Sequence, residues 1–220
     1  MILLIVGDDT NANEVRAKFG DRHQYLHAIN HPKATGLLNT CDVVFDFAIT
    51  QDPSQMSIYN NSAPQVIFLN SVKASLKKLC CNTDHTTRSF FGFNGMPTFF
   101  NREMLEVSLL HEDQLAKLQD ECSKLNSLFE RVKDTVGMVT ARVICMIINE
   151  AYYTLEEGTA SREDIDLAMK LGTNYPYGPF EWCLRIGAKE VCDLLNAVYH
   201  DTQDDRYQIC QLLLKESQAL

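Results

Sequence analysis

The sequence lacks clusters of positive charge. Its 220 residues include 20 lysine and arginine residues against 29 aspartate and glutamate residues, which gives a formal net charge of −9. Nucleic acids and anionic membrane surfaces bind proteins through concentrated lysine and arginine side chains. We therefore expect neither a nucleic acid nor a membrane among the partners of this protein.

The sequence also lacks the cysteine spacing of a metal or redox site. Eight cysteines are scattered along the chain without a C-x-x-C pair, at Cys41, Cys80, Cys81, Cys122, Cys145, Cys183, Cys192 and Cys210. Free cysteines pack as small apolar side chains, and they stay reduced in the cytosol. The pattern predicts reduced thiols, no bound metal and a cytoplasmic protein.

Long apolar runs are missing as well. Ile2–Val6 is too short for a signal peptide, and no basic region precedes it. The most apolar later stretch, Val143–Ile148, is far shorter than the roughly 20 residues that span a bilayer. We therefore expect neither a secretory signal nor a membrane span.

Short apolar runs do alternate with helix-like segments through the first half of the chain. The runs are "ILLIV", "YLHAI", "DVVFDFAI" and "QVIFLN", and the segments between them are "EVRAKFG", "PSQMSIYNN" and "SVKASLKKL". This alternation favours βα units and a parallel sheet. "SFFGFN" and "EMLEVSLL" follow as two further strands, so the sheet is expected to end near Leu110.

From His111 onward the pattern becomes helical. Apolar residues recur at helical spacing in "HEDQLAKLQDECSKLNSLF", and "VTARVICMIINEAYYTLEEG" predicts a buried central helix. Ser161 is placed to cap a helix over "REDIDLAMKLG", and two more helices are expected over 188–199 and 204–216. We predict an α/β domain with a parallel sheet over residues 1–110 and an all-α domain over residues 111–220.

The turn after the first strand carries part of a dinucleotide-binding pattern. In G-x-G-x-x-G, the glycines permit the tight turn, the approach of pyrophosphate and the packing of helix on strand. The three positions hold Gly7, Asp9 and Ala12, and Asn30 stands where the pattern has a ribose-binding acid. Asp8 and Asp9 would repel a pyrophosphate at the helix N-terminus. The alternative interpretation is an ordinary strand, turn and helix, with Asp8, Asp9 or Thr10 near the N-cap.

Two stretches resemble the 3-hydroxyacyl-CoA dehydrogenase family. They are "FFGFNGMPTFFNREMLEV" and, more strongly, "VGMVTARVICMIINEAYYTLEEGTASREDIDLAMKLGTNYPYGPFEW". The resemblance implies a shortened Rossmann-like N-terminal domain, an all-α C-terminal domain that forms homodimers, and a site between them for NAD and a 3-hydroxyacyl-CoA. It also implies a role in fatty acid metabolism. The segment "NHPKATGLLNTC" is shorter than the family's helical pair that helps to hold CoA.

The resemblance assigns the proton-transfer residues one by one. Asn94 matches the Asn of the family's His-Phe-Phe-Asn motif, and Glu106 matches the Glu that orients the His. The His position itself holds Phe91, which cannot accept a proton. Glu106 is therefore the catalytic candidate, and His85 and His111 are the histidines that could replace the missing base.

The substrate and cofactor contacts are assigned in the same way. The family's Asn-Thr-Ser segment resembles "NSV", so Asn70 and Ser71 match while Val72 replaces the Ser that contacts substrate. Ala141 replaces the Asn of an Asn-Arg pair in the first C-terminal helix. The candidates that result are Ser71 and Asn94 for substrate binding and Gly7 for cofactor binding.

Three functions are open at this point. The first is a 3-hydroxyacyl-CoA dehydrogenase-like pseudoenzyme with degenerate NAD and catalytic sites that binds an acyl-CoA-like ligand or a partner protein. The second is an active, divergent NAD-dependent dehydrogenase that uses Glu106 with His85 or a water molecule. The third is a non-catalytic subunit that dimerises with a full-length relative.

Overall fold

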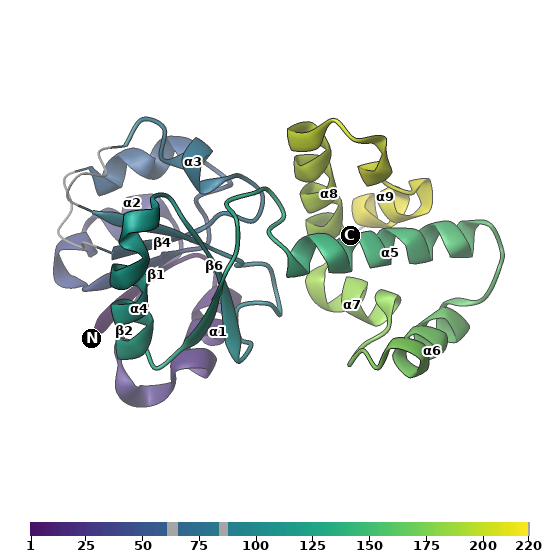
Figure 1. The fold of residues 1–220 in the computed structure, drawn as a ribbon, viewed down its shortest axis with the longest axis horizontal. Helices are drawn as coiled ribbons and strands as arrows, with labels where there is room; N and C mark the ends of the chain where they lie inside the picture. Colours follow the sequence, from purple (N-terminus) through teal and green to yellow (C-terminus); the bar gives the residue numbers. More distant parts are fainter. Residues whose placement is uncertain (61–65, 84–87, 220) are drawn as a thin grey trace. The chain divides into compact units, whose positions relative to one another are not determined.

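The chain folds into two compact units. The computed structural model describes residues 1–60, 66–83 and 88–219, and its units are Met1–Met138 and Val139–Leu220 (Figure 1). The first unit extends past the boundary predicted at residue 110, because helix α4 (Leu115–Lys124) packs on the sheet and strand β7 (Leu128–Arg131) joins it.

The apolar runs predicted as strands form one sheet in the first unit. The strands are β1 (Ile2–Val6), β2 (Gln24–Ala28), β3 (Val43–Asp46), β4 (Val66–Asn70), β5 (Ser89–Phe93), β6 (Met104–Leu109) and β7. Their order is β2-β1-β3-β4-β5-β6-β7, and every neighbouring pair is parallel except β5 and β6. The predicted α/β domain with a mostly parallel sheet is confirmed, with β6 and β7 running against the other strands.

Successive residues of the strands supply two separate cores. In β1, Leu3 and Ile5 join a cluster with α1 (Asp9–Phe19) and α4, whereas Leu4 and Val6 face the opposite cluster. That second cluster includes residues of α2 (His31–Thr35), the 3-10 helix Pro53–Tyr59 and α3 (Leu76–Leu79). A sheet covered on both faces needs strands that are apolar at every position, which is why these runs do not alternate with polar residues.

Three segments of the first unit differ from their sequence prediction. The helix expected to reach Leu128 ends at Lys124, and Leu128 begins β7 instead. The helix-like segment "SVKASLKKL" forms only the four residues of α3. The segment "PSQMSIYNN" forms a 3-10 helix as far as Tyr59, and its last residue lies outside the described residues.

The second unit is entirely helical in the part that the structure describes. Its helices are α5 (Thr140–Glu156), α6 (Arg162–Thr173), α7 (Pro179–Ile186), α8 (Ala188–Thr202) and α9 (Gln211–Gln218), with a 3-10 turn at Asp205–Tyr207 (Figure 1). The predicted all-α domain is confirmed. Ser161 caps α6 as predicted, because its side chain accepts a hydrogen bond from the backbone N–H of Asp164.

Two features of this unit were not predicted. Helix α7 follows directly from the loop after α6. Pro179 stands in its first turn, and the Asp166 carboxylate accepts the backbone N–H groups of Phe180 and Glu181 at 2.8 and 3.1 Å. The helix expected over 204–216 is divided into the 3-10 turn and α9, because the buried Asn149 side chain bonds to Gln208 and Cys210 between them.

Candidate functional site

The turn between β1 and α1 is closed by its own side chains. Asp8 is the N-cap of α1, and its carboxylate accepts the backbone N–H of Asn11 at 2.9 Å. The Asn11 side chain in turn accepts the backbone N–H of Asp8 at 3.1 Å. This reciprocal pair is a capping box, which satisfies two of the N–H donors that a helix N-terminus would otherwise offer to an anion.

Gly7 is held in the same closed arrangement. A Cβ at this position would lie 2.5 Å from Asn11 Oδ1 and 3.1 Å from Phe47 Cβ, so only glycine fits without movement. The carbonyl oxygen of Gly7 is 2.9 Å from His27 Nε2. Close packing of the turn against its own neighbours therefore accounts for the glycine.

The turn does not fit the pyrophosphate of a dinucleotide. Asp8 places a carboxylate at the helix N-terminus, and the Asp9 side chain next to it is 94% exposed. Two negative charges at this point oppose a doubly charged group. Asn30, at the position of the ribose-binding acid, caps α2 by accepting the backbone N–H of Lys33 at 3.1 Å.

A row of polar side chains follows the carboxyl ends of β3, β4 and β5. The Asn70 side chain donates to the carbonyl of Phe47 at 3.3 Å and accepts the N–H of Gly95 at 3.1 Å. The next contact joins Asn94 Nδ2 to Glu106 Oε2 at 3.1 Å. Ligands of open α/β sheets bind at the carboxyl ends of the strands, so this row is the candidate site of the first unit.

The structure brings together only part of the predicted site. Asn94 and Glu106 are hydrogen-bonded to each other, and Asn94 is buried with 1% of its surface exposed. Ser71 is also buried, and its hydroxyl has no hydrogen-bond partner within the described residues. Gly7 belongs to the turn after β1. The roles proposed for these four residues stay predictions.

The residues weighed as proton acceptors lie in different surroundings. Phe91 is fully buried in the sheet, with its ring 5.2 Å from that of Phe68. His111 is exposed at the start of the 3-10 helix Glu112–Gln114, after the end of β6. His85 lies outside the described residues.

Sequence reasoning missed a buried cluster around Asp46, the last residue of β3. Its carboxylate accepts the Tyr59 hydroxyl at 2.8 Å, the His31 ring nitrogen Nε2 at 2.9 Å and the backbone N–H of Ala48 at 2.9 Å. Because a carboxylate only accepts, Nε2 of His31 carries the proton. Burial and the Asp46 charge raise the pKa of Tyr59 well above its usual range. The signal in the sequence is an Asp inside the apolar run "DVVFDFAI".

Residues 1–60, 66–83 and 88–219 contain neither a metal-binding cluster nor a membrane-spanning helix. No group of three or more His, Cys, Asp or Glu side chains there is arranged to hold a metal ion. No helix within those ranges combines the length and the apolar character needed to cross a membrane.

Comparison with known sequences gives a match in the helical unit. Residues 137–219 match the family described as 3-hydroxyacyl-CoA dehydrogenase, C-terminal domain. The chain is 45% identical over 83 residues to a 3-hydroxyadipyl-CoA dehydrogenase of Escherichia coli (strain K12), which covers 38% of this chain and 18% of that protein. It is 28% identical over 190 residues to a 3-hydroxybutyryl-CoA dehydrogenase of Bradyrhizobium diazoefficiens, covering 83% of this chain and 64% of the relative. The matches thus span less than two thirds of either relative.

Comparison with solved structures supports the fold. The chain superposes on FadB2 of M. tuberculosis with a TM-score of 0.79 at 16% identity, covering 99% of this chain and 93% of that one. It superposes on (S)-3-hydroxybutyryl-CoA dehydrogenase PaaH1 from Ralstonia eutropha with a TM-score of 0.72 at 21% identity, with the same coverage of both chains. At these identities the likeness concerns the fold: a Rossmann-like α/β domain followed by a helical domain.

Proposed function

We propose that this chain, whose residues 137–219 match the C-terminal domain of the 3-hydroxyacyl-CoA dehydrogenase family, binds an acyl-CoA-like ligand without hydride transfer to or from NAD. The relatives are named for 3-hydroxyadipyl-CoA and 3-hydroxybutyryl-CoA, and the proposal takes from them the chemical class of the ligand. We further propose that the protein acts in the cytoplasm as a homodimer.

The observation that carries this proposal is the Asp8 carboxylate at the N-terminus of α1. A dinucleotide pyrophosphate gains its binding energy from the N–H groups and positive dipole at such a terminus. Here the capping box between Asp8 and Asn11 uses two N–H groups of this terminus, and the Asp8 carboxylate places a negative charge against its positive dipole. The buried Phe91 gives independent support, because the resemblance expects a His base at that position and hydride transfer requires an acceptor for the hydroxyl proton.

The homodimer is proposed from the exposed apolar side chains of the helical unit. Large exposed hydrophobic residues are unusual on a monomer surface when they gather in patches. Leu167 and Leu171 are one turn apart on α6, with 53% and 78% of their surfaces exposed. Light scattering after size-exclusion chromatography should give twice the chain mass, and Leu171→Lys should shift it towards the monomer.

Ligand binding is tested by two titrations of the same protein. Nicotinamide fluorescence should show no saturation with NADH up to millimolar concentration, with a verified dehydrogenase of the family as positive control. Acetoacetyl-CoA should raise the melting temperature, since a ligand that binds only the folded state stabilises it. Micromolar binding of NADH would contradict the proposed loss of the cofactor site.

A designed change at the turn sharpens this test. Asp8→Ser with Asp9→Gly keeps a capping hydroxyl, removes both carboxylates and restores the second glycine of the pattern. We expect this double variant to bind NADH more tightly than the unchanged protein. Asp113→Ser, an exposed aspartate change in the same unit, is the matched control.

An activity assay tests the divergent-enzyme alternative, which the hydrogen bond between Asn94 and Glu106 favours. We expect no acetoacetyl-CoA-dependent loss of NADH absorbance. Turnover that Glu106→Gln abolishes would overturn the proposal and establish Glu106 as part of a working site. Glu130→Gln is the control, because Glu130 is the exposed partner of Glu106 on the neighbouring strand β7.

A further inference from the structure

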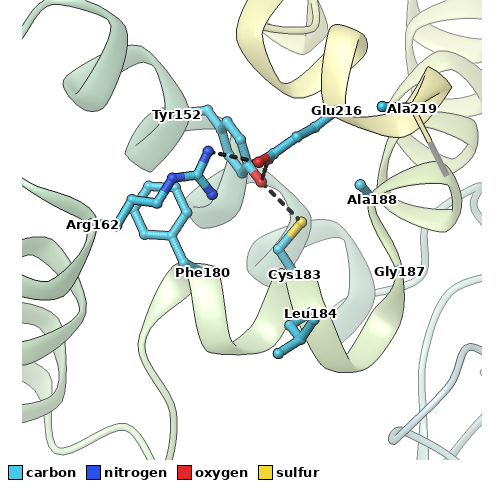
Figure 2. A pocket seen from close by; sticks show the side chains of 9 residues that line it. All are labelled: Tyr152, Arg162, Phe180, Cys183, Leu184, Gly187, Ala188, Glu216 and Ala219. Atoms are coloured by element: carbon cyan, nitrogen blue, oxygen red, sulfur yellow. Dashed lines mark hydrogen bonds and ion pairs between the residues drawn. The ribbon is translucent and has the colours of Figure 1, made fainter.

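The helical unit contains a pocket that the proposed function does not use. It measures about 280 Å³ and is formed entirely within this unit. Figure 2 shows side chains from α5, α6, α7, α8 and α9 around it. The apolar part of the lining includes Phe180, Leu184, Ala188 and Ala219.

Polar groups gather at one end of the pocket. Arg162 Nη2 donates to Glu216 Oε1 at 2.7 Å, and the Tyr152 hydroxyl donates to the other oxygen of Glu216. The guanidinium carbon lies 5.2 Å from the centre of the Tyr152 ring and 4.8 Å from that of Phe180. Two aromatic rings and one carboxylate therefore fix the plane of the Arg162 head group.

This polar end carries no net charge. The positive charge of Arg162 is offset by Glu216 at ion-pair distance. Burial raises the pKa of the Cys183 thiol to about 11, and burial together with Glu216 raises the pKa of Tyr152, so both groups keep their protons at neutral pH. The thiol lies 3.6 Å from the Tyr152 oxygen, and because that hydroxyl donates to Glu216, the thiol is the donor to it.

Hydrogen-bond donors are nevertheless available there. A guanidinium has five N–H donors; the ion pair with Glu216 takes one of them, and a hydrogen bond to the Tyr152 hydroxyl takes another. In Figure 2 the other terminal nitrogen of Arg162 points away from Glu216, to the side of Phe180 and Cys183. An oxygen entering the pocket would meet this donor, whereas a carboxylate would also meet the nearby negative charge of Glu216.

We propose that this pocket binds an uncharged molecule with a short apolar chain and one terminal hydrogen-bond acceptor, of the class of short-chain amides. The apolar chain would lie against Phe180, Leu184 and Ala188, and its carbonyl oxygen would accept from Arg162. The volume is at the lower end of the range for small-molecule pockets, which limits the chain to a few carbons. The site is independent of the acyl-CoA proposal.

The test compares two probes of the same length, hexanamide and hexanoate. Trp182, the single tryptophan of the sequence, lies in α7 between Phe180 and Cys183 and reports binding by its emission. Hexanamide should change the emission with saturation, and hexanoate should require at least about tenfold higher concentration. Isothermal titration calorimetry repeats the comparison without relying on the fluorophore.

Two variants identify the groups responsible. Arg162→Met should weaken hexanamide binding about tenfold, since methionine has no N–H donor. Glu216→Gln leaves the Arg162 charge without its carboxylate, so it should reverse the preference and favour hexanoate. Asp193→Asn makes the same chemical change in the exposed ion pair with Lys189 and should leave both probes unaffected. Thermal unfolding monitored by circular dichroism confirms that each variant is folded.

Three results would overturn the proposal. The first is the absence of saturable hexanamide binding by both methods. The second is a preference of the unchanged protein for hexanoate. The third is a Glu216→Gln variant that is folded and keeps the preference for hexanamide, because the charge balance would then play no part in the choice of ligand.

Discussion

Two clusters in this molecule use the same kinds of side chain in opposite settings. In the first unit, Asp46 accepts from the Tyr59 hydroxyl and the His31 ring. In the second unit, Glu216 accepts from the Tyr152 hydroxyl and the Arg162 guanidinium. Each cluster thus joins a carboxylate, a tyrosine hydroxyl and a side-chain N–H donor.

The clusters differ in their access to solvent. Asp46 and Tyr59 have no exposed surface and His31 is 4% exposed, whereas the side chains of Arg162 and Glu216 are 36% and 39% exposed beside a pocket. A buried carboxylate is stable only when donors surround it, so the first cluster acts on stability. The second can exchange a contact with water for a contact with a ligand. The same chemistry therefore supports structure in one unit and recognition in the other.

The largest expected effect comes from breaking the closed cluster. Asp46→Ala removes the buried acceptor that the His31 ring, the Tyr59 hydroxyl and the backbone N–H of Ala48 share. We expect the free energy of unfolding to fall by about 3–5 kcal/mol, as for other buried pairs that lose one partner. Urea denaturation measures it, with the exposed Asp113→Ala as control. A loss no larger than that of the control would show that the cluster is not a source of stability.

A smaller effect with a distinct pH dependence is expected from Tyr59→Phe. At neutral pH the variant should lose about 2 kcal/mol, because the hydrogen bond reaches a charged acceptor. Since the folded pKa of Tyr59 is raised, the unfolded chain releases this proton near pH ~10 while the folded protein keeps it. Stability is then lost as the pH rises above that value. Tyr59→Phe should lose less over this range, and a parallel decline of both proteins would contradict the assignment.

Much of the fold could be predicted from the sequence because its signals are local. A strand buried on both faces is apolar at every position. The start of α6 is predictable because Ser161 is a typical N-cap residue. Strand β7 was not predicted, because Leu128 continues the helical spacing of α4 and the segment becomes a strand only by pairing with β6. Helix α7 was not predicted, because its start depends on Asp166, which lies thirteen residues before Pro179 in the sequence.

The candidate sites were less predictable, because they depend on contacts between segments that are distant in the sequence. The family resemblance named Asn94 and Glu106 as candidate site residues, but neither the resemblance nor their spacing predicted the hydrogen bond between them. His31 and Tyr59 reach Asp46 from α2 and from the 3-10 helix that follows β3. Their meeting depends on how both segments pack on one face of the sheet. Residue type and spacing do not contain that information.

The smallest stability effect is expected from a substitution in the open cluster of the second unit. Glu216→Gln breaks the charge pair of the open cluster, yet the free energy of unfolding should change by less than about 1 kcal/mol, because both charged side chains are more than a third exposed and water replaces the contact. Urea denaturation of Glu216→Gln and of Asp46→Ala compares the losses in the free energy of unfolding for the two clusters. A loss comparable to that of Asp46→Ala would mean that the contacts of Glu216 with Tyr152 and Arg162 stabilise the packing of α9 on α5 and α6. The open cluster would then be a structural element, and a change in ligand preference on its substitution could no longer be ascribed to charge alone.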